Sequence, residues 1–250
     1  MQNEELELLK LRTVVRFGDM IELKKNGVVL HRLLCGDSRD TEQVKMLMNG
    51  EKADLVFTDP DYTMSFENIR TCYLNVKEIA QPAVAFWMCS DKQAVQLAYS
   101  DFESFSHFFI HDRKTVKYSS STRPIQRHTI ICKFGHKKMK NLKDAFFTIV
   151  AVTNGNFFRF SQPTKHGKRA ELPAKFIEHY TNEGDIVVDI FMHSGSTMVA
   201  AHRLGRRCLG MEIEPYFCQY VIDRMVAEDS SLEVLINKKQ YSEAKSYTLF

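Results

Sequence analysis

Four consecutive residues, Asp59, Pro60, Asp61 and Tyr62, carry the groups needed to hold a planar amine. They follow an apolar run at residues 53–58, which is typical of a buried strand. The Asp59 carboxylate and the Pro60 carbonyl can each accept one N–H of an exocyclic amino group, while Tyr62 stacks on the ring that carries this group. An aromatic amine is a poor nucleophile because its lone pair is delocalised into the ring. Two acceptors localise that lone pair, so the tetrapeptide predicts attack by a ring amine.

A second loop, at residues 189–197, follows another apolar run and leads into a predicted helix. Gly195 lets the backbone pass close to a ligand, and the first turn of the helix offers free N–H groups. Glu212 ends the next predicted strand, where an acid can accept both hydroxyls of a ribose. The loop matches neither G-x-G-x-x-G nor G-x-x-x-x-G-K-S/T, which disfavours hydride-transfer cofactors and P-loop nucleotides.

Alternating predicted strands and helices place these two loops on one α/β sheet. An Asn-Gly pair ending at Gly27 predicts a hairpin between strands at residues 12–23 and 28–34. Further strands are predicted at residues 53–58, 83–88, 107–110, 128–133, 186–191 and 207–214, with an ambiguous one at 232–236. Helices are predicted at residues 40–50, 173–182, 197–204 and 215–225. The series predicts a doubly wound, mostly parallel sheet with helices on both faces, whose strands end at one ligand-binding edge.

The 250 residues have a net charge of +3, but the charge is unevenly distributed. Residues 113–175 contain fifteen Lys or Arg against two acidic residues, a net charge of +13 that leaves −10 on the remainder. Aromatic residues and histidines are interleaved with these basic residues. Such a stretch favours a nucleic acid, whose phosphates pair with the charges and whose bases stack on the rings, although charge alone does not separate DNA from RNA.

Other features exclude whole classes of protein. A hydrophobic fraction of 44% excludes a disordered chain, and the longest apolar runs are far shorter than the ~20 residues of a membrane span. The acidic start MQNEELELLK does not resemble a secretion signal, so a soluble cytoplasmic protein with no membrane partner is expected. The six cysteines include no C-x-x-C pair, which argues against a zinc cluster or a disulfide framework, and no metal site is predicted.

The motifs in this order resemble those of the β class of S-adenosylmethionine-dependent DNA amino-methyltransferases. The resemblance rests on HRLLCGDS, DLVFTDPDY, GDIVVDIFMHSGST and GRRCLGMEIEP, and covers residues 14–225. It is closest to adenine methyltransferases of phage and prophage, in which an Asp-Pro-Pro-Tyr motif precedes the target-recognition stretch and the cofactor loop. It implies a Rossmann-like methyltransferase fold in which residues 1–250 form a single domain, with a basic recognition region at residues 113–170.

The resemblance also implies roles for individual residues. Asp59, Pro60, Asp61 and Tyr62 would form the catalytic motif that holds a base flipped out of DNA. S-adenosyl-L-methionine would be bound by Asp37, Phe191, His193, Ser194, Gly195, Ser196, Thr197 and Glu212. DNA would be contacted by Arg113, Lys114, Lys117, Arg123, Arg127, Lys137, Lys138, Lys140, Lys165, Lys168 and Arg169. The expected reaction is methyl transfer to adenine N6, in a bacterial or phage-infected cell, by a homodimer or beside a methyltransferase partner subunit.

The sequence departs from the family motifs at three positions. Asp61 replaces the second Pro of Asp-Pro-Pro-Tyr, which leaves the loop less preorganised and places a second carboxylate near Asp59, so the pKa of one of them is expected to rise. His193 replaces the first Gly of the cofactor loop, and Ile190 replaces a Pro. A His at a glycine position crowds the cofactor or requires an uncommon backbone conformation. A non-catalytic DNA-binding homologue or partner subunit is therefore the main alternative, beside a cytosine-N4 or an RNA amino-methyltransferase.

Overall fold

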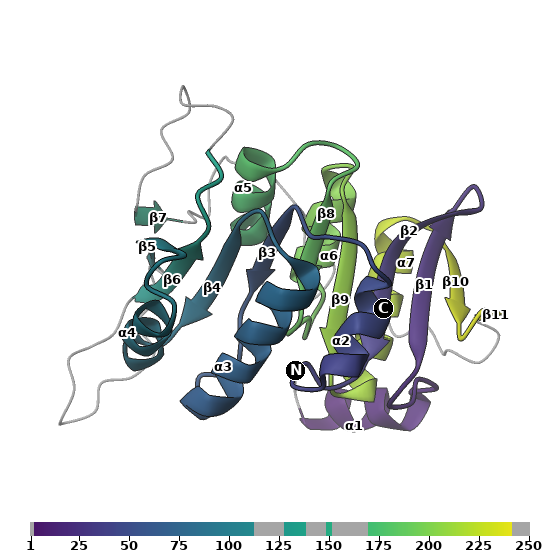
Figure 1. The fold of residues 1–250 in the computed structure, drawn as a ribbon. Coiled ribbons are helices and arrows are strands. Elements are labelled where there is room, and N and C mark those ends of the chain that lie inside the picture. The colour runs from purple at the N-terminus through teal and green to yellow at the C-terminus, as the bar shows by residue number, and fades with distance from the viewer. Residues whose placement is uncertain (1–2, 113–127, 139–148, 152–169, 242–250) are drawn as a thin grey trace.

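The computed structural model describes residues 3–112, 128–138, 149–151 and 170–241. Within these residues eleven strands form one sheet, in the order β11-β10-β1-β2-β9-β8-β3-β4-β6-β5-β7 (Figure 1). The strands are β1 (Met20–Lys25), β2 (Val28–Cys35), β3 (Leu55–Thr58), β4 (Ala85–Cys89), β5 (Phe105–Asp112), β6 (His128–Phe134), β7 (Ile149–Ala151), β8 (Ile186–Asp189), β9 (Arg207–Glu212), β10 (Glu233–Ile236) and β11 (Lys239–Gln240).

Helices cover both faces of the sheet, as the sequence predicts. One face packs against α2 (Thr41–Met48), α3 (Phe66–Asn75) and α4 (Asp91–Ser100), and α3 continues as a π-helical turn, η1 (Val76–Ala80). The other face packs against α5 (Glu171–Tyr180), α6 (Ser196–Arg203) and α7 (Pro215–Glu228), while α1 (Asn3–Arg12) lies against α7.

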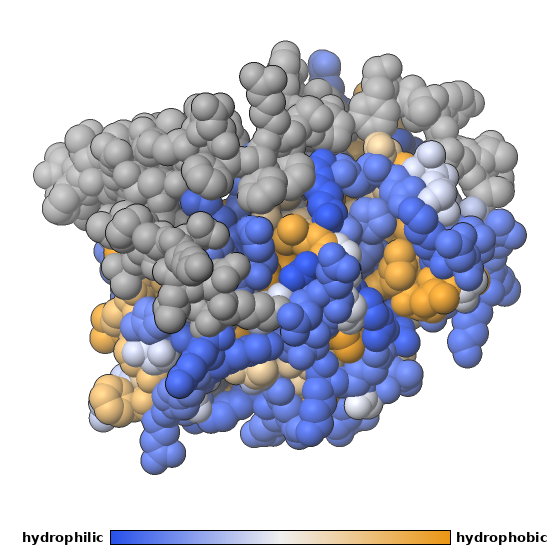
Figure 2. Space-filling view, turned by 90° about the horizontal axis from the view of Figure 1, so that it is seen from above, coloured by the Kyte–Doolittle hydropathy of each residue, from blue (hydrophilic) through white to orange (hydrophobic). Residues whose placement is uncertain are grey.

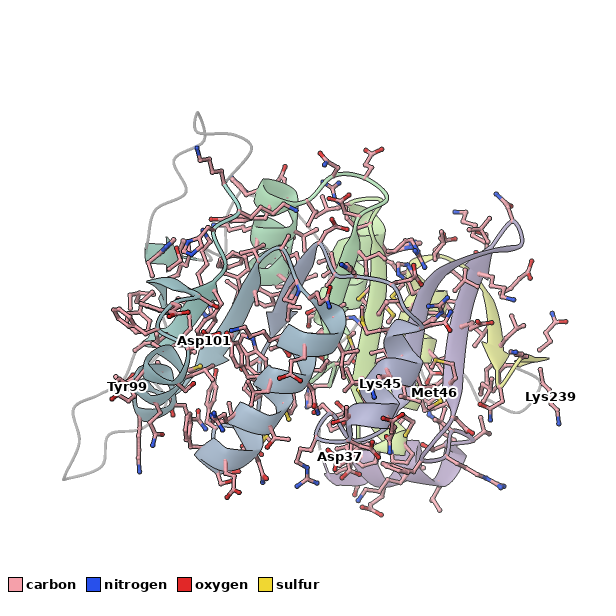
Figure 3. The ribbon with its side chains drawn as sticks, in the orientation of Figure 1. Asp37, Lys45, Met46, Tyr99, Asp101 and Lys239 are labelled. Carbon is pink, nitrogen blue, oxygen red and sulfur yellow. The ribbon has the colours of Figure 1, made fainter. Side chains whose placement is uncertain are left out.

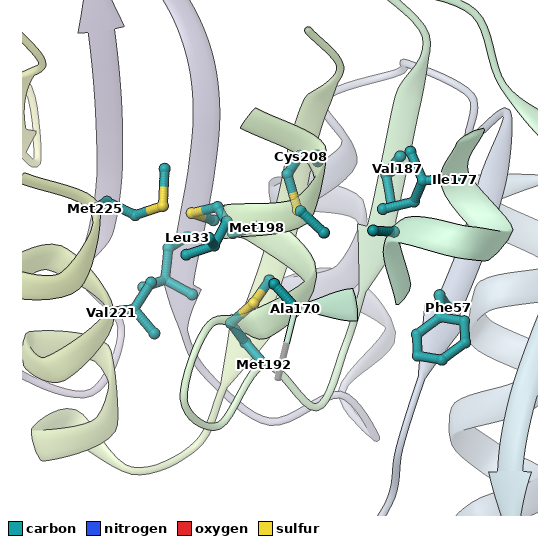
Figure 4. Packing of buried hydrophobic residues seen from close by; sticks show 14 of the residues in the cluster. Leu33, Phe57, Ala170, Ile177, Val187, Met192, Met198, Cys208, Val221 and Met225 are labelled. Carbon is teal, nitrogen blue, oxygen red and sulfur yellow. The ribbon is translucent and has the colours of Figure 1, made fainter. Parts of the chain in front are cut away.

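Buried side chains from neighbouring strands build the core beneath α5, α6 and α7. Leu33, Cys208, Val187 and Phe57, on β2, β9, β8 and β3, point toward these helices (Figure 4). Helix residues such as Met198 pack onto them. Successive strand residues alternate between the two faces, and both faces are covered. The central strands are therefore apolar along their whole length, which explains the runs seen in the sequence.

The five central strands β2, β9, β8, β3 and β4 are parallel, so their carboxyl ends share one edge. This edge is the lower one in Figure 1, and Asp37, which follows β2, lies there in Figure 3. At both ends of the sheet the strands turn antiparallel, with β6 beside β4 and β1 beside β2. The predicted α/β sheet with a parallel core is therefore confirmed, and the sheet as a whole is mixed, with five parallel and five antiparallel strand pairs among the described strands. None of the helices in the described ranges is long and apolar enough to cross a membrane.

The amino-terminal segment corrects one prediction. The hairpin turn at Asn26 and Gly27 is present, but residues 12–19 are not a strand, and residues 3–12 form helix α1. Tertiary contacts hold this segment. Arg12 forms an ion pair of 2.6 Å with Asp223 of α7, and the Gln219 side chain accepts a hydrogen bond from the Val14 amide. A local apolar pattern does not report such contacts.

A chain of hydrogen bonds connects the core to the surface beside α6. The buried His31 ring accepts the Cys208 N–H at Nδ1, so its own proton is on Nε2, which lies 3.0 Å from Nδ1 of His202. His202 Nε2 in turn lies 3.2 Å from Asp229, which also pairs with Lys25. Burial, with smaller contributions from His202 and Arg207, lowers the pKa of His31 to about 3.

We expect His31 to make folding stability depend on pH. Between pH 6.5 and about 3 the unfolded chain binds a proton at this position and the folded chain does not, so the free energy of unfolding decreases as pH falls, by about 1.4 kcal/mol per unit. In the variant His31→Leu this slope disappears, although its stability is lower at every pH because the Cys208 amide loses its acceptor. Urea unfolding of both proteins between pH 6.5 and 5 measures the difference. Equal slopes would contradict a neutral, buried His31.

Candidate active site

The first candidate loop begins where β3 ends. Thr58 is fully buried, and its hydroxyl donates a 2.8 Å hydrogen bond to Asp189, at the end of the neighbouring strand β8. Asp59 follows it half-buried, and Pro60 is buried. Tyr62 is 39% exposed, so part of its ring is accessible for stacking. The residues of the predicted catalytic motif therefore leave the sheet at its carboxyl-terminal edge.

Asp61 stiffens the loop by a different means from the proline it replaces. It is exposed, and its Oδ1 accepts hydrogen bonds from both the amide and the hydroxyl of Thr63, each of 2.8 Å. This is an Asx turn, in which the side chain fixes the backbone two residues ahead. The two donors hold the pKa of Asp61 below its ordinary value, so the predicted rise from repulsion by Asp59 is wrong for Asp61.

The start of α4 holds the same loop from the other side. Gln93 is buried, and its Nε2 donates to the carbonyls of Tyr62 and Met64, each at 3.2 Å. Its Oε1 in turn accepts from the Ser90 amide and hydroxyl, so a capping box aims the amide group. Gln93 is not among the residues predicted from the sequence, although Ser followed three residues later by Gln is the sequence signal of such a cap.

The second loop begins at Asp189, a buried carboxylate with three donors. Besides Thr58, it accepts from the Phe191 amide at 3.0 Å and from the Thr197 hydroxyl at 2.7 Å. The pKa of Asp189 lies above its ordinary value. Burial raises it most, the three donors partly offset that rise, and the nearby Asp59 adds to it. Phe191 lies 6.4 Å, between ring centroids, from the buried Trp87 of β4.

His193 takes the uncommon conformation that the sequence predicts. Its φ is +44°, the left-handed region that a glycine occupies without strain. Its amide donates a 2.7 Å hydrogen bond to Glu212, which helps hold this conformation. The exposed ring lies against Phe217 of α7, with ring centroids 4.1 Å apart. The imidazole is therefore packed on α7.

The rest of the loop leads into α6. The buried Arg224 of α7 donates to the Ser194 carbonyl at 2.7 Å. Gly195 has a φ of +76°, a conformation that favours glycine, and a Cβ at this position would crowd the Val221 side chain at 3.1 Å. As N-cap of α6 it supplies no side chain to the first-turn amides, which leaves this end of the helix open to an anion. Ser196 and Thr197 are buried in that turn.

Glu212 lies at the end of β9, beside the same loop. It is 7% exposed, and its two oxygens accept the amides of His193 and Glu214. The pKa of Glu212 lies above its ordinary value, because burial raises it more than the two amides lower it. Each carboxylate oxygen retains a second lone pair, so the group can still accept two hydroxyls.

Asp37 lies at the end of β2, next to Glu212. The Gly36 amide donates to the Glu212 carbonyl at 2.8 Å, and a Cβ on Gly36 would collide with Gln43. Arg39 pairs with the Asp37 carboxylate at 2.6 Å and holds its pKa below the ordinary value. The predicted cofactor residues therefore share one edge, across β2, β9 and β8.

Only two of the predicted DNA-binding residues, Lys137 and Lys138, lie within the described residues. They follow β6, which runs antiparallel to β4, and Lys137 donates to the carbonyl of Asp54, just before β3. These two lysines are therefore at the amino-terminal edge, opposite the Asp59 loop. Figure 2 looks onto that edge, and the described residues visible there are largely hydrophilic, with smaller hydrophobic areas. The other predicted DNA-binding residues lie outside the described ranges: Arg113, Lys114, Lys117, Arg123, Arg127, Lys140, Lys165, Lys168 and Arg169.

Neither a metal site nor a disulfide is seen in the described ranges. They hold no group of three His, Cys, Asp or Glu side chains that could bind a metal ion. The six cysteines, all described, are free and buried.

A family model described as DNA methylase matches residues 99–223, half of the chain. The chain belongs to this DNA methylase family. The match begins in α4 and runs through residues 189–197 and Glu212 into α7, so it covers the second candidate loop and not the first.

Two relatives illustrate the match within the DNA methylase family. The Type II methyltransferase M2.DpnII of Streptococcus pneumoniae is 27% identical over 128 residues, which are 50% of this chain and 46% of that protein. The Type II methyltransferase M.BglI of Bacillus subtilis is 46% identical over 48 residues, 19% of this chain and 14% of that protein. The aligned segments thus span less than half the length of these relatives.

Solved structures of methyltransferases share the fold. M1.HpyAVI in complex with SAM has a TM-score of 0.62 at 21% identity, over 78% of this chain and 98% of the other. The PvuII DNA methyltransferase, described as cytosine-N4-specific, has a TM-score of 0.60 at 15% identity, over 82% and 90%. The predicted Rossmann-like methyltransferase fold is therefore confirmed.

Proposed function

We propose that this chain transfers a methyl group from S-adenosyl-L-methionine to the N6 amino group of adenine in DNA. The observation that carries the proposal is the contact between the two candidate loops: Thr58, directly before Asp59, and Thr197, at the start of α6, donate to the same Asp189 carboxylate. This contact supports the proposal because it holds the end of β3, directly before the proposed amine-holding motif, beside the proposed cofactor loop. The choice of adenine N6 over cytosine N4 rests on Asp59, where the family resemblance gives Asp to adenine enzymes.

The residues of the second loop fit the proposed cofactor, which M1.HpyAVI, a protein of the same fold, binds. Glu212 has the lone pairs to accept two ribose hydroxyls, and the uncapped start of α6 suits a carboxylate. Asp37 and Gly36 close the site on the β2 side. The cofactor would supply an activated methyl group on a sulfonium.

The first loop fits the adenine. The Asp59 carboxylate and the Pro60 carbonyl would each accept a hydrogen bond from one amino N–H, so the nitrogen lone pair is localised toward the methyl donor. The N–C bond would form as the bond from sulfur to the methyl group breaks, and the amine would lose one of its two protons. Tyr62 would stack on the flipped base, whose extrusion from the duplex costs a few kcal/mol. Three contacts preorganise these groups: Thr58 to Asp189, Asp61 to Thr63, and Gln93 to Tyr62 and Met64. Preorganised polar groups are a large source of catalysis.

Methyl transfer from labelled cofactor to DNA of varied sequence tests this function. Label recovered as N6-methyladenine supports it, and label on cytosine N4 would move the chain to the other substrate. The strained His193 favours one alternative, a DNA-binding homologue without catalysis. Binding of DNA with no incorporation by wild type would establish that alternative, and incorporation regained by His193→Gly would identify His193 as its cause.

Asp61→Pro is expected to keep the methylation rate within about threefold of wild type. The proline ring replaces the stiffness that the Asx turn supplies to the loop. Asp61→Ala is the matched control, since it has neither device, and we expect it to be about tenfold slower because the loop is less preorganised. The turnover of the three proteins on one DNA decides this. Loss of turnover in Asp61→Pro would instead assign Asp61 a direct role with DNA or substrate.

We also propose that residues 113–127 approach the DNA. Asp112 and His128, which flank them, pair with each other at the carboxyl-terminal end of the sheet, beside Ile130 and Cys89. The chain therefore leaves and re-enters the described structure at the edge that carries Asp59. The basic residues of this segment are Arg113, Lys114, Lys117, Arg123 and Arg127.

Neutralising Arg113, Lys114 and Lys117 together is expected to flatten the salt dependence of DNA binding. Removal of one phosphate contact reduces the steepness of log K against log salt by about 0.9. The matched control neutralises Lys137 and Lys138, which lie at the opposite edge, and should leave the slope unchanged. Binding isotherms at several salt concentrations provide the slopes. A flatter slope in the control alone would place the DNA on the other edge.

A further inference from the structure

Asp189 is a buried carboxylate that joins two parts of the candidate active site. Its Oδ1 accepts the Thr58 hydroxyl and the Phe191 amide, and its Oδ2 accepts the Thr197 hydroxyl. Thr58 is the last residue of β3 and directly precedes Asp59, whereas Phe191 and Thr197 belong to the cofactor loop and the first turn of α6. The Asp189 side chain therefore joins the second loop, to which it belongs, to the end of β3 directly before the first loop.

The neighbouring strands make this junction short. β3 and β8 are parallel, and Val56 pairs with Val188, so Thr58 and Asp189 come from adjacent strand ends. Thr58 is fully buried, and Asp189 and Thr197 are each less than 5% exposed, so water does not compete for these hydrogen bonds. Asp189, at the start of the second loop, and Thr58, directly before Asp59, are therefore in direct contact, with no intermediate side chain.

Fold stability alone does not account for a carboxylate here. A buried charge is costly to desolvate, and hydrophobic residues of similar volume often serve a core as well or better. Asp189 also lies close enough to Asp59 for the two charges to repel. The arrangement is unfavourable as packing, but it holds two hydroxyls and an amide in fixed directions.

We propose that Asp189 is a positioning residue that couples the cofactor loop to the Asp59 loop through Thr58. The proposal rests on the function proposed above and adds a role for a residue that does not itself touch substrate. Cofactor bound at Phe191–Thr197 stiffens the Asp189 carboxylate, which through Thr58 holds Asp59 and Pro60 in place for the amine.

Amide hydrogen exchange tests the coupling with S-adenosylhomocysteine as the ligand. In wild type the ligand slows exchange both at residues 192–197 and at the amides of residues 61–64. In Thr58→Val, which keeps the shape and removes the hydroxyl, exchange at 61–64 is roughly ten- to hundredfold faster without ligand, the effect of losing one hydrogen bond to a charged group. The ligand then protects only residues 192–197. Thr58→Ser keeps the hydroxyl and restores the wild-type pattern.

Kinetics and a matched control separate positioning from general loosening. Thr58→Val lowers kcat by at least tenfold while the affinity for S-adenosylhomocysteine stays within threefold. Thr181→Val removes another fully buried hydroxyl, which donates to the Ile177 carbonyl away from this site, and leaves exchange at 61–64 unchanged. The single Trp87, beside Phe191, reports by its fluorescence whether the ligand has reached the loop.

Three results would overturn the proposal. Without ligand, amide exchange at residues 61–64 could be equally fast in Thr58→Val and in wild type. That result would show that the hydrogen bond between Thr58 and Asp189 does not hold the first loop. If Thr181→Val accelerates exchange at residues 61–64 as much as Thr58→Val does, the acceleration reflects a general loss of stability. In wild type, the bound ligand could slow exchange at residues 192–197 and not at residues 61–64. That result would refute the coupling and leave the proposed function intact. Absence of any ligand effect at 192–197 would instead refute the proposed function and this proposal with it.

Discussion

Asp59→Ala is expected to lower the rate of methyl transfer to DNA by roughly 10² to 10³, the loss seen when one preorganised polar group is removed from an active site. Asp59 offers a carboxylate directly after β3. The residue before it, Thr58, is held by its hydrogen bond to Asp189. Without the Asp59 carboxylate the adenine amine keeps a single acceptor, the Pro60 carbonyl, and its lone pair stays delocalised.

The controls for Asp59→Ala separate catalysis from binding. Affinity for S-adenosylhomocysteine should stay within a few-fold, because the cofactor residues Glu212 and Gly195 lie on β9 and at the start of α6. Asp59→Asn keeps one acceptor oxygen and should fall between wild type and Asp59→Ala. Measured by single-turnover kinetics on one DNA, full activity in Asp59→Ala would refute the amine-holding mechanism.

Glu212→Ala is expected to weaken S-adenosylhomocysteine binding by roughly 10², since hydrogen bonds to charged groups contribute about 1.5–3 kcal/mol each. The effect has two sources in the structure. The carboxylate is the acceptor for the ribose hydroxyls, and it also holds the His193 amide in a left-handed conformation that otherwise costs about 1–3 kcal/mol. The substitution removes a ligand contact and relaxes the loop together.

Calorimetry with Glu212→Ala and Glu212→Gln distinguishes these sources. Gln keeps one acceptor oxygen, so Glu212→Gln should retain more affinity than Glu212→Ala. In wild type the affinity should also fall at low pH, because only the ionised carboxylate accepts at every lone pair. Burial raises the pKa of Glu212, so this loss begins at a higher pH than for an exposed Glu. Unchanged affinity in Glu212→Ala would rule out the ribose-binding role.

The two departures from the family motifs have structural explanations that local sequence does not reveal. Asp61 replaces a proline and regains rigidity through Thr63, two residues ahead. His193 replaces a glycine, adopts the glycine conformation, and places its ring on Phe217. Both explanations depend on a neighbour's position, so the sequence shows the departure but not its compensation.

Local sequence patterns were sufficient to predict the α/β class, the parallel core strands and the two loops at their carboxyl ends. These features follow from apolar runs bounded by turn residues and from motif spacing, which are local properties. The sequence analysis mispredicted residues 12–19 as a strand and did not predict helix α1, because contacts with Gln219 and Asp223, about 200 residues away along the chain, hold this segment.

Which polar residues meet depends on the tertiary structure. Thr58 lies far from Asp189 and Thr197 in the sequence, and no local pattern marks the three residues as a group. The pairing of β3 with β8 brings the hydroxyls of Thr58 and Thr197 onto the buried Asp189 carboxylate. The fold also separates basic residues that are grouped in the sequence: antiparallel β6 carries Lys137 and Lys138 to the edge opposite Asp59. Charge clusters and motifs are recognised along the chain. The direction of each strand decides at which edge of the sheet its flanking residues lie, and that direction depends on pairing with strands that are distant in the sequence.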